Sequence, residues 1–203
     1  MENRESFIKN GLPNEVDNMN EDMLREVIGE KNQIYKGAIL DVQKWNVTLS
    51  NGSPAFREVV LHRGASAIVP VDHEGNVYLV RQYRTPLDKI MLEIPAGKLD
   101  YWGEDRFECA KRELREETGF SAEKWTHLMD TATTPGFCSE VISLYLAQNL
   151  TMGETDFDDD EFLDLVKMPL KDAVSMIMRG EITDGKTALA ILMADKILFS
   201  EDK

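Results

Sequence analysis

Residues 97–120 read GKLDYWGEDRFECAKRELREETGF and form the most informative stretch of this 203-residue chain. Within it, Phe107, Ala110 and Leu114 recur at helical spacing. Gly119 stands where a left-handed glycine commonly ends a helix. The spacing therefore predicts a helix over residues 104–118, preceded by a loop that contains glycine.

Three acids of this helix share one face. Glu113, Glu116 and Glu117 stand at positions i, i+3 and i+4, which brings their carboxylates within a few ångströms of each other. Such like charges repel, and a hard divalent cation with a preference for oxygen ligands relieves the repulsion. A solvated acidic face is the alternative reading, and it is the usual one for an isolated Glu-Glu pair.

The wider pattern decides between these readings, because it resembles the Nudix box, a loop–helix–loop that holds magnesium against a diphosphate. The matching positions are Gly97, Glu104, Arg112, Glu113, Leu114, Glu116, Glu117, Gly119 and Phe120. The spacing departs at one place: six residues separate Gly97 from Glu104, whereas the family has five. We interpret the extra residue, at Tyr101-Trp102, as a bulge in the loop before the helix.

The resemblance implies a fold and a metal site. The fold is of the α+β or α/β class, with a mixed β-sheet sandwiched between helices. The metal is Mg2+, with Mn2+ as a substitute, and its ligands are Glu113, Glu117, the backbone carbonyl of Ala96, and Glu116 as a ligand or near neighbour. Arg112 and Glu116 are the catalytic residues of the helix, and Gly97, Glu104 and Gly119 shape the box.

The implied reaction is attack of water on phosphorus beside the bound metal. A carboxylate must accept the proton of that water. In the nucleoside-diphosphate-sugar branch of the family the base often comes from a loop after the box, and residues 156–161 read DFDDDE. We choose Glu161 as the base, although an ordinary solvated loop is the alternative for this segment.

The flanks resemble the ADP-ribose pyrophosphatase branch. The matches are RQYR at 81–84 followed by LEIPAG at 92–97, REVV at 57–60, and Pro135, sixteen residues after Gly119. The resemblance implies cleavage of ADP-ribose to AMP and ribose 5-phosphate. Alternatives are GDP-mannose, another nucleotide sugar, a diphosphate cofactor, or a catalytically silent nucleotide sensor. The closely spaced glutamates argue against a sensor, because binding alone does not require them.

Several residues are candidates for substrate contacts. Arg57 and Arg84 have the guanidinium geometry that suits phosphate or ribose oxygens, although each can instead form a structural ion pair. Trp45 offers a stacking surface for adenine, with core packing as the alternative. Glu93 can orient a substrate arginine or bind metal through water, or it can form a salt bridge at a strand end. Pro135 marks the turn typical of ADP-ribose preference.

Three regions follow along the chain. Residues 1–32 are polar, with a weak helical pattern around Met23, Leu24, Val27 and Ile28, and we expect a helix or arm. Residues 33–61 alternate β-type runs with turn signals, which predicts a small antiparallel β subdomain. Residues 62–203 form the main domain, which includes predicted strands at 125–129, 141–146 and 162–166 and helices at 170–178 and 185–199.

The composition of the chain limits the classes of partner and the cellular location that we expect. The net charge of −14, from 37 acidic and 23 basic residues, disfavours nucleic acid as a partner. No apolar run reaches the roughly 18 residues of a membrane span. Two cysteines and no secretory signal at the N-terminus predict a cytoplasmic protein. The resemblance also implies a homodimer, in which the N-terminal sheet of each protomer completes the site of its partner.

Overall fold

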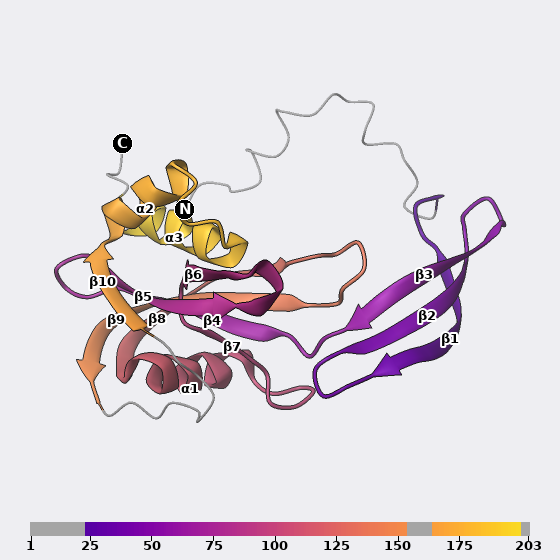
Figure 1. Ribbon diagram of the computed structural model, residues 1–203, viewed down its shortest axis with the longest axis horizontal. Helices are drawn as coiled ribbons and strands as arrows, with labels where there is room; N and C mark the ends of the chain where they lie inside the picture. Colours follow the sequence, from indigo (N-terminus) through magenta and orange to yellow (C-terminus); the bar gives the residue numbers. More distant parts are fainter. Residues whose placement is uncertain (1–22, 154–163, 200–203) are drawn as a thin grey trace, which may run out of the picture. The chain divides into compact units, whose positions relative to one another are not determined.

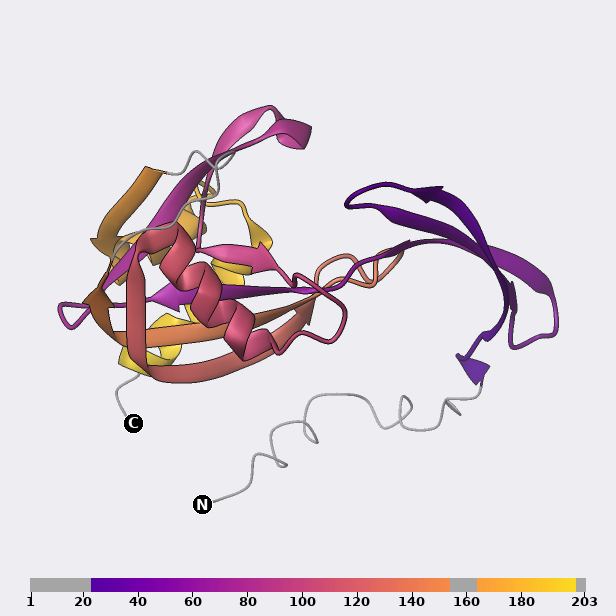
Figure 2. The same ribbon diagram turned by 90° about the horizontal axis from the view of Figure 1, so that it is seen from below.

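The computed structural model describes residues 23–153 and 164–199. The chain divides into two compact units, residues 1–60 and 61–203 (Figure 1, Figure 2). Among the described residues, no helix combines the length and the apolar character needed to cross a membrane.

The first unit is a three-stranded antiparallel sheet in the order β1-β2-β3. Its strands are β1 (Val27–Lys36), β2 (Asp41–Thr48) and β3 (Pro54–Leu61). The turn between β2 and β3 uses Gly52 at a positive φ of 84°, a conformation that glycine adopts without steric cost. The expected antiparallel sheet is therefore present.

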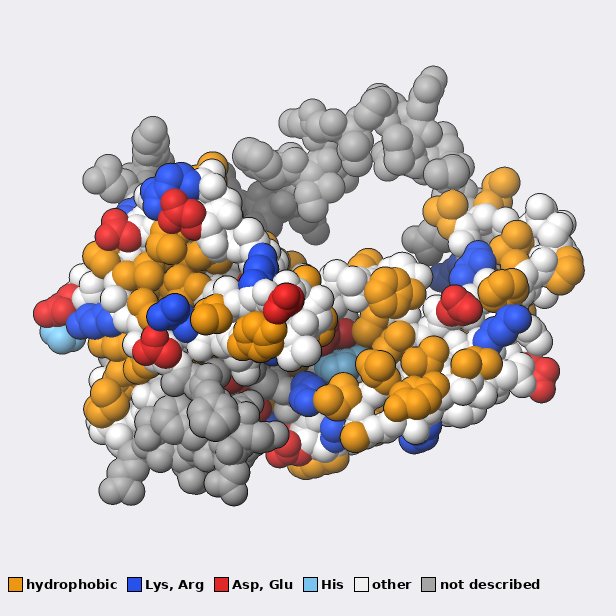
Figure 3. Space-filling model, in the orientation of Figure 1, with side chains coloured by type: hydrophobic (Ala, Val, Ile, Leu, Met, Phe, Trp, Pro, Cys, Tyr) orange, Lys and Arg blue, Asp and Glu red, His pale blue; other side chains and the backbone are white. Residues whose placement is uncertain are grey.

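The helix expected around Val27 and Ile28 is wrong, because both residues belong to β1. They pair with Thr48 and Val47 of β2, and these long-range backbone hydrogen bonds override a weak local helical pattern. β1 also crosses residues 32 and 33, where we placed a boundary between arm and sheet. Every residue of β1 is exposed, and Figure 3 shows hydrophobic side chains over this sheet.

The second unit contains two sheets. The larger has the order β7-β4-β9-β8, from Ala96–Lys98, Ala65–Pro70, Val141–Met152 and Phe120–Ala132. Only the β4–β9 pair of this sheet is parallel. The smaller sheet is antiparallel, with the order β10-β5-β6, from Asp164–Pro169, Asn76–Arg84 and Lys89–Glu93.

Helices cover both faces of the larger sheet, as Figure 1 shows. They are α1 (Arg106–Thr118), α2 (Leu170–Met178) and α3 (Gly185–Phe199). Alternate residues of β4 serve the two sides: Ala67 and Val69 join the core with α2 and α3, whereas Ile68 joins the core under α1. The mixed sheet between helices confirms the predicted fold class.

The helix of the box begins and ends where its sequence favours it. Asp105 caps α1 by accepting hydrogen bonds from the backbone N–H groups of Phe107 and Glu108. Gly119 ends it at a φ of 73° and donates its N–H to the carbonyl of Arg115. Ala110 and Leu114 are buried against the sheet, which leaves the glutamate face of the helix for the loop at 95–100.

Candidate active site

A cleft of about 1130 Å³ lies in the second unit. Its walls come from β5, β6, β7 with the loop that follows it, α1, the facing ends of β8 and β9, and the start of α3 with the turn before it. Most of the predicted site residues line it: Arg84, Glu93, Ala96, Gly97, Arg112, Glu113, Glu116 and Glu117. Segments far apart in the sequence thus bring the box and the RQYR motif to one cavity.

Gly97 is required by the position of Glu113. A Cβ atom built on Gly97 would overlap the carboxylate of Glu113, so any larger residue would displace that carboxylate. The backbone of Gly97 does not have a positive φ, and contact rather than chain conformation therefore explains the glycine. Gly97 therefore leaves space for the carboxylate of Glu113.

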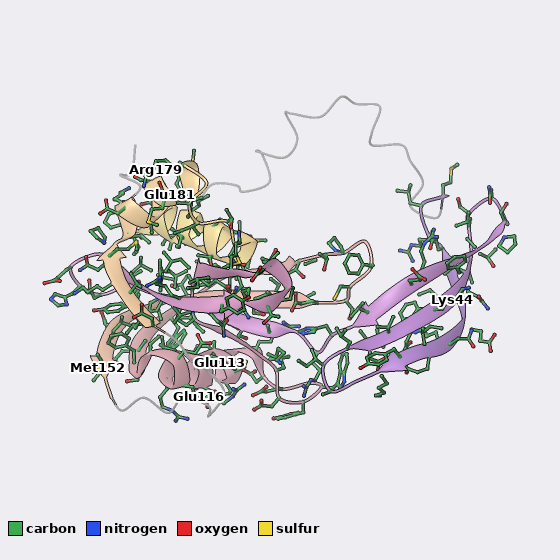
Figure 4. All side chains as sticks on the ribbon, in the orientation of Figure 1. Lys44, Glu113, Glu116, Met152, Arg179 and Glu181 are labelled. Atoms are coloured by element: carbon green, nitrogen blue, oxygen red, sulfur yellow. The ribbon has the colours of Figure 1, made fainter. Side chains whose placement is uncertain are left out.

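Arg112 organises the acids of α1. Its Nη1 donates to Glu113 Oε1 at 2.7 Å and to Glu116 Oε2 at 3.1 Å, so both carboxylates direct an oxygen at one cationic nitrogen. Figure 4 labels the two glutamates on α1. Burial alone would lower the pKa of Arg112, but the surrounding anions, Glu113 foremost, raise it above its ordinary value. Arg112 is therefore a permanent cation among these carboxylates.

Glu104 holds the loop that carries the extra residue. Its Oε2 accepts a hydrogen bond from the backbone N–H of Asp100 at 2.6 Å, and its Oε1 lies 3.7 Å from Arg112 Nη2. The backbone N–H of Glu104 in turn donates to the carbonyl of Tyr101 at 3.3 Å. Residues 101–104 thus form a tight turn, with Gly103 at a positive φ of 87°.

The oxygen donors of the site suit a hard divalent cation. Ala96 N donates to Glu117 Oε2 at 3.1 Å, which places the start of β7 beside this glutamate. Glu113 and Glu117 are buried and Glu116 is half-buried, and all three are carboxylates of the kind that Mg2+ prefers. Across residues 23–153 and 164–199, no three acidic, histidine or cysteine side chains enclose a metal position as they stand. In this structure the guanidinium of Arg112 supplies the positive charge beside Glu113 and Glu116, whose carboxylate oxygens are ligands of the kind that a divalent cation would take.

A second charge cluster, centred on the buried Glu93, also lines the cleft. Arg84 donates from Nε and Nη2 to the two oxygens of Glu93, each at 2.8 Å. Lys186 Nζ also contacts Glu93. Burial alone would raise the pKa of Glu93, but the hydrogen bonds and charges of Arg84 and Lys186 lower it to about 2. Glu93 is therefore an anion that holds an arginine at the cleft.

Other predicted residues lie elsewhere. Arg57 and Trp45 belong to the first unit, where Arg57 pairs with Glu26 and the Trp45 ring lies 4.0 Å from the ammonium of Lys31. Pro135 is exposed in a turn that follows the cleft residue Thr133. Glu161 lies outside the described residues.

Sequence reasoning missed Asp184, in the turn before α3, and Lys186, in the first turn of α3, which both line the cleft. Asp184 Oδ2 accepts a hydrogen bond from the backbone N–H of Thr187 at 3.0 Å, so it acts as a helix cap. The spacing of Asp184 and Thr187, three residues apart at the start of the predicted helix, could have indicated this cap from the sequence. Nothing local, however, indicates that this turn meets Glu93.

Comparisons with known proteins all point to one family. Residues 60–189 match the model of the NUDIX domain. An ADP-ribose pyrophosphatase of Bacillus subtilis (strain 168) is 41% identical over 170 residues, which cover 83% of this chain and 91% of that protein. A methanol dehydrogenase activator of Bacillus methanolicus is 43% identical over 161 residues, 78% of this chain and 86% of that protein.

Two further similarities are more distant. A GDP-mannose pyrophosphatase of Yersinia enterocolitica is 31% identical over 140 residues, 64% of this chain and 72% of that protein. A solved structure, described as a crystal structure of ADP compounds hydrolase, superposes with a TM-score of 0.76 at 25% identity. The match covers 86% of this chain and 94% of that one.

Proposed function

The chain belongs to the NUDIX domain family, and on that premise we propose that it hydrolyses the pyrophosphate bond of ADP-ribose to give AMP and ribose 5-phosphate. As a family member with relatives named for nucleotide-sugar hydrolysis, it is a Nudix pyrophosphohydrolase. The observation that carries the proposal is the row of glutamates on α1, which lines the same cleft as Arg84. The glutamates suit a metal, and Arg84 suits a phosphate or ribose oxygen.

We assign the metal site to Glu113, Glu116, Glu117 and the carbonyl of Ala96, with Mg2+ as the metal and Mn2+ as its substitute. A bound divalent cation would neutralise charge on the diphosphate and lower the pKa of the attacking water. Arg112 keeps Glu113 and Glu116 oriented toward one point, since both accept hydrogen bonds from its Nη1. Glu161 is our choice for the base that accepts the proton.

We assign substrate recognition to candidate residues from each of the two units. Arg84, held by Glu93, is placed to donate to a diphosphate or terminal-ribose oxygen. Arg57 and Trp45 of the first unit remain our candidates for a second charge contact and for adenine stacking. Pro135 lies in the turn beside Thr133 and supports ADP-ribose as the preferred substrate.

GDP-mannose is the alternative substrate, because one relative carries that name. ADP-ribose is favoured since the pyrophosphatase of B. subtilis covers more of the chain at higher identity. The intact glutamates argue against a silent sensor, because a binding module has no need of repelling acids on one helix face.

We also propose that the protein is a cytoplasmic homodimer whose N-terminal sheet, β1 to β3, contributes to the interface, with residues 62–203 as the catalytic domain. Large apolar side chains are exposed on the first unit: Val27, Ile28, Ile34, Tyr35, Ile39, Leu40 and Phe56. A partner that covers such a surface stabilises it, since contiguous exposed apolar area marks interaction sites. Both cysteines, Cys109 and Cys138, are free thiols, which fits a reducing compartment.

A substrate panel tests the activity. Purified protein is incubated with ADP-ribose, GDP-mannose or NADH in the presence of Mg2+, and the phosphate that alkaline phosphatase releases from the products is measured. We expect the highest kcat/KM with ADP-ribose. For the metal test AMP is measured directly by chromatography, because EDTA also inactivates alkaline phosphatase, and we expect no AMP after chelation. Equal or faster cleavage of GDP-mannose would contradict the substrate assignment, and metal-independent cleavage would contradict the metal site.

A further inference from the structure

Four charged side chains form a continuous chain of ion pairs at one end of the cleft: Arg84, Glu93, Lys186 and Asp184. We propose that Lys186 is a positioning residue, which acts through Glu93 to hold Arg84 in the orientation that binds substrate. The inference rests on the proposed function, because it takes Arg84 as the contact for a diphosphate or ribose oxygen.

The burial of the four groups sets their roles. The side chains of Glu93, Lys186 and Asp184 are 3%, 9% and 19% exposed, whereas that of Arg84 is 41% exposed. Glu93 and Lys186 are therefore largely withdrawn from solvent, and Arg84 is the member most open to a ligand. The pair with Glu93 uses Nε and Nη2 of Arg84, so that Nη1 lies outside this pair.

Lys186 fixes the carboxylate that holds Arg84. Its Nζ contacts Glu93 Oε2, the same oxygen that accepts a hydrogen bond from Arg84 Nη2. Lys186 Nζ also lies 3.0 Å from Asp184 Oδ2, which anchors the ammonium beside Glu93. Without Lys186, the buried carboxylate of Glu93 would lose one of its two cationic partners and its fixed orientation, and the guanidinium of Arg84 would turn with it.

The backbone beneath Lys186 is anchored independently. The Thr187 hydroxyl donates to Asp184 Oδ2 at 2.5 Å and accepts a hydrogen bond from Ile94 N at 2.9 Å. Thr187 is fully buried. The first turn of α3 is thus tied to the residue that follows Glu93, and this hydrogen bond holds Lys186 near Glu93.

The test combines Lys186→Met with a matched control, Lys171→Met. Lys171 also pairs with an aspartate, Asp195 at 2.8 Å, but this pair joins α2 to α3 and does not line the cleft. We expect Lys186→Met to raise the KM for ADP-ribose about tenfold with kcat within about twofold of wild type, because it weakens substrate binding. Lys171→Met should leave both constants unchanged.

A double-mutant cycle identifies the route of the effect. If Lys186 acts through Arg84, Lys186→Met should raise KM no further in an Arg84→Ala background. If the KM of the double variant rose by the product of the two single-variant factors, the two residues would act independently and the proposal would be overturned. A Lys186→Met enzyme with wild-type KM would overturn it as well. Should Lys186→Met fail to fold, Lys186→Gln removes the charge but keeps hydrogen-bond donors, and the same cycle applies to it.

A measurement without substrate separates this inference from the proposed function. In ¹⁵N–¹H spectra the Nε–H signal of Arg84 is identified by its loss in Arg84→Ala. We expect this signal to shift or broaden in Lys186→Met and to stay unchanged in Lys171→Met. An unchanged Arg84 signal in Lys186→Met would overturn the positioning role. Failure of wild type to cleave ADP-ribose would instead refute the proposed function alone.

Discussion

Gly97→Ala tests the geometry of the site most directly, because the structure assigns this glycine a single task. The added Cβ atom would overlap the Glu113 carboxylate, which must then move. Moving it breaks its 2.7 Å hydrogen bond from Arg112. The backbone at Gly97 is one that alanine can adopt, so no conformational strain adds to the effect.

The two consequences differ in size. Crowding costs about 1 to 3 kcal/mol, partly offset by about 0.4 to 1 kcal/mol from the reduced entropy of the unfolded chain. The net loss of about 1 to 2 kcal/mol corresponds to a fall in Tm of about 2 to 8 °C for a protein of this size. Activity should fall further, by about a hundredfold, because even residues that only orient metal ligands affect metal affinity or activity by about 10- to 100-fold.

The assay compares kcat/KM for ADP-ribose and Tm in Gly97→Ala and in a matched control, Gly180→Ala. Gly180 has a positive φ of 73° and open space around its Cβ position, in the connection after α2. Alanine there should cost about 1 to 2 kcal/mol through backbone strain alone and leave kcat/KM unchanged. A Gly97→Ala enzyme as active as Gly180→Ala would refute the reasoning, since Glu113 would then be dispensable at its present position.

Three further predictions concern single carboxylates. Glu117→Gln should lower kcat by about a thousandfold or more with an unchanged circular dichroism spectrum, because a neutral amide is a poor ligand for a hard cation; near-normal turnover would exclude Glu117 as an essential ligand. Glu161→Gln should lower kcat with little change in Mg2+ affinity measured by calorimetry, and wild-type turnover would move the base to another residue. Glu93 has a pKa of about 2 in the folded protein against an ordinary 4.5, so its charge stabilises the fold above pH 4.5 and this contribution is lost as the pH falls toward 2. Glu93→Gln should therefore flatten the decline of the unfolding free energy between pH 4.5 and pH 2, and an unchanged slope in urea titrations would contradict the pairing with Arg84 and Lys186.

Sequence reasoning found the box because its signals are local. The spacing of Phe107, Ala110 and Leu114 predicted α1, and Gly119 ends that helix as expected. The helix begins at Arg106 rather than at 104, because Asp105 takes the capping position. The same kind of local pattern failed at Val27 and Ile28, where pairing with a strand some twenty residues further along the chain decided the structure.

The site was predicted in part. Arg84 and Glu93 were separate candidates, and the sequence left open whether Glu93 would meet a metal or an arginine. Antiparallel pairing of β5 with β6 places them on neighbouring strands, with Arg84 opposite Lys89 and Glu93 opposite Val80. The arginine side chain reaches along the sheet and donates two hydrogen bonds to the Glu93 carboxylate. Gly97 was recognised only as a position in a motif, whereas its packing on the Glu113 carboxylate is visible only once β7 lies against α1.

The sequence by itself determined the helix with its row of glutamates, the glycine that ends it and the family to which these belong, since residues within a few positions of each other specify all three. Tertiary structure alone decided that Lys186, more than ninety residues further along the chain, would contact Glu93. The physical reason is that the approach of α3 to β6 depends on the packing of both around a common core. No short-range pattern encodes that distance.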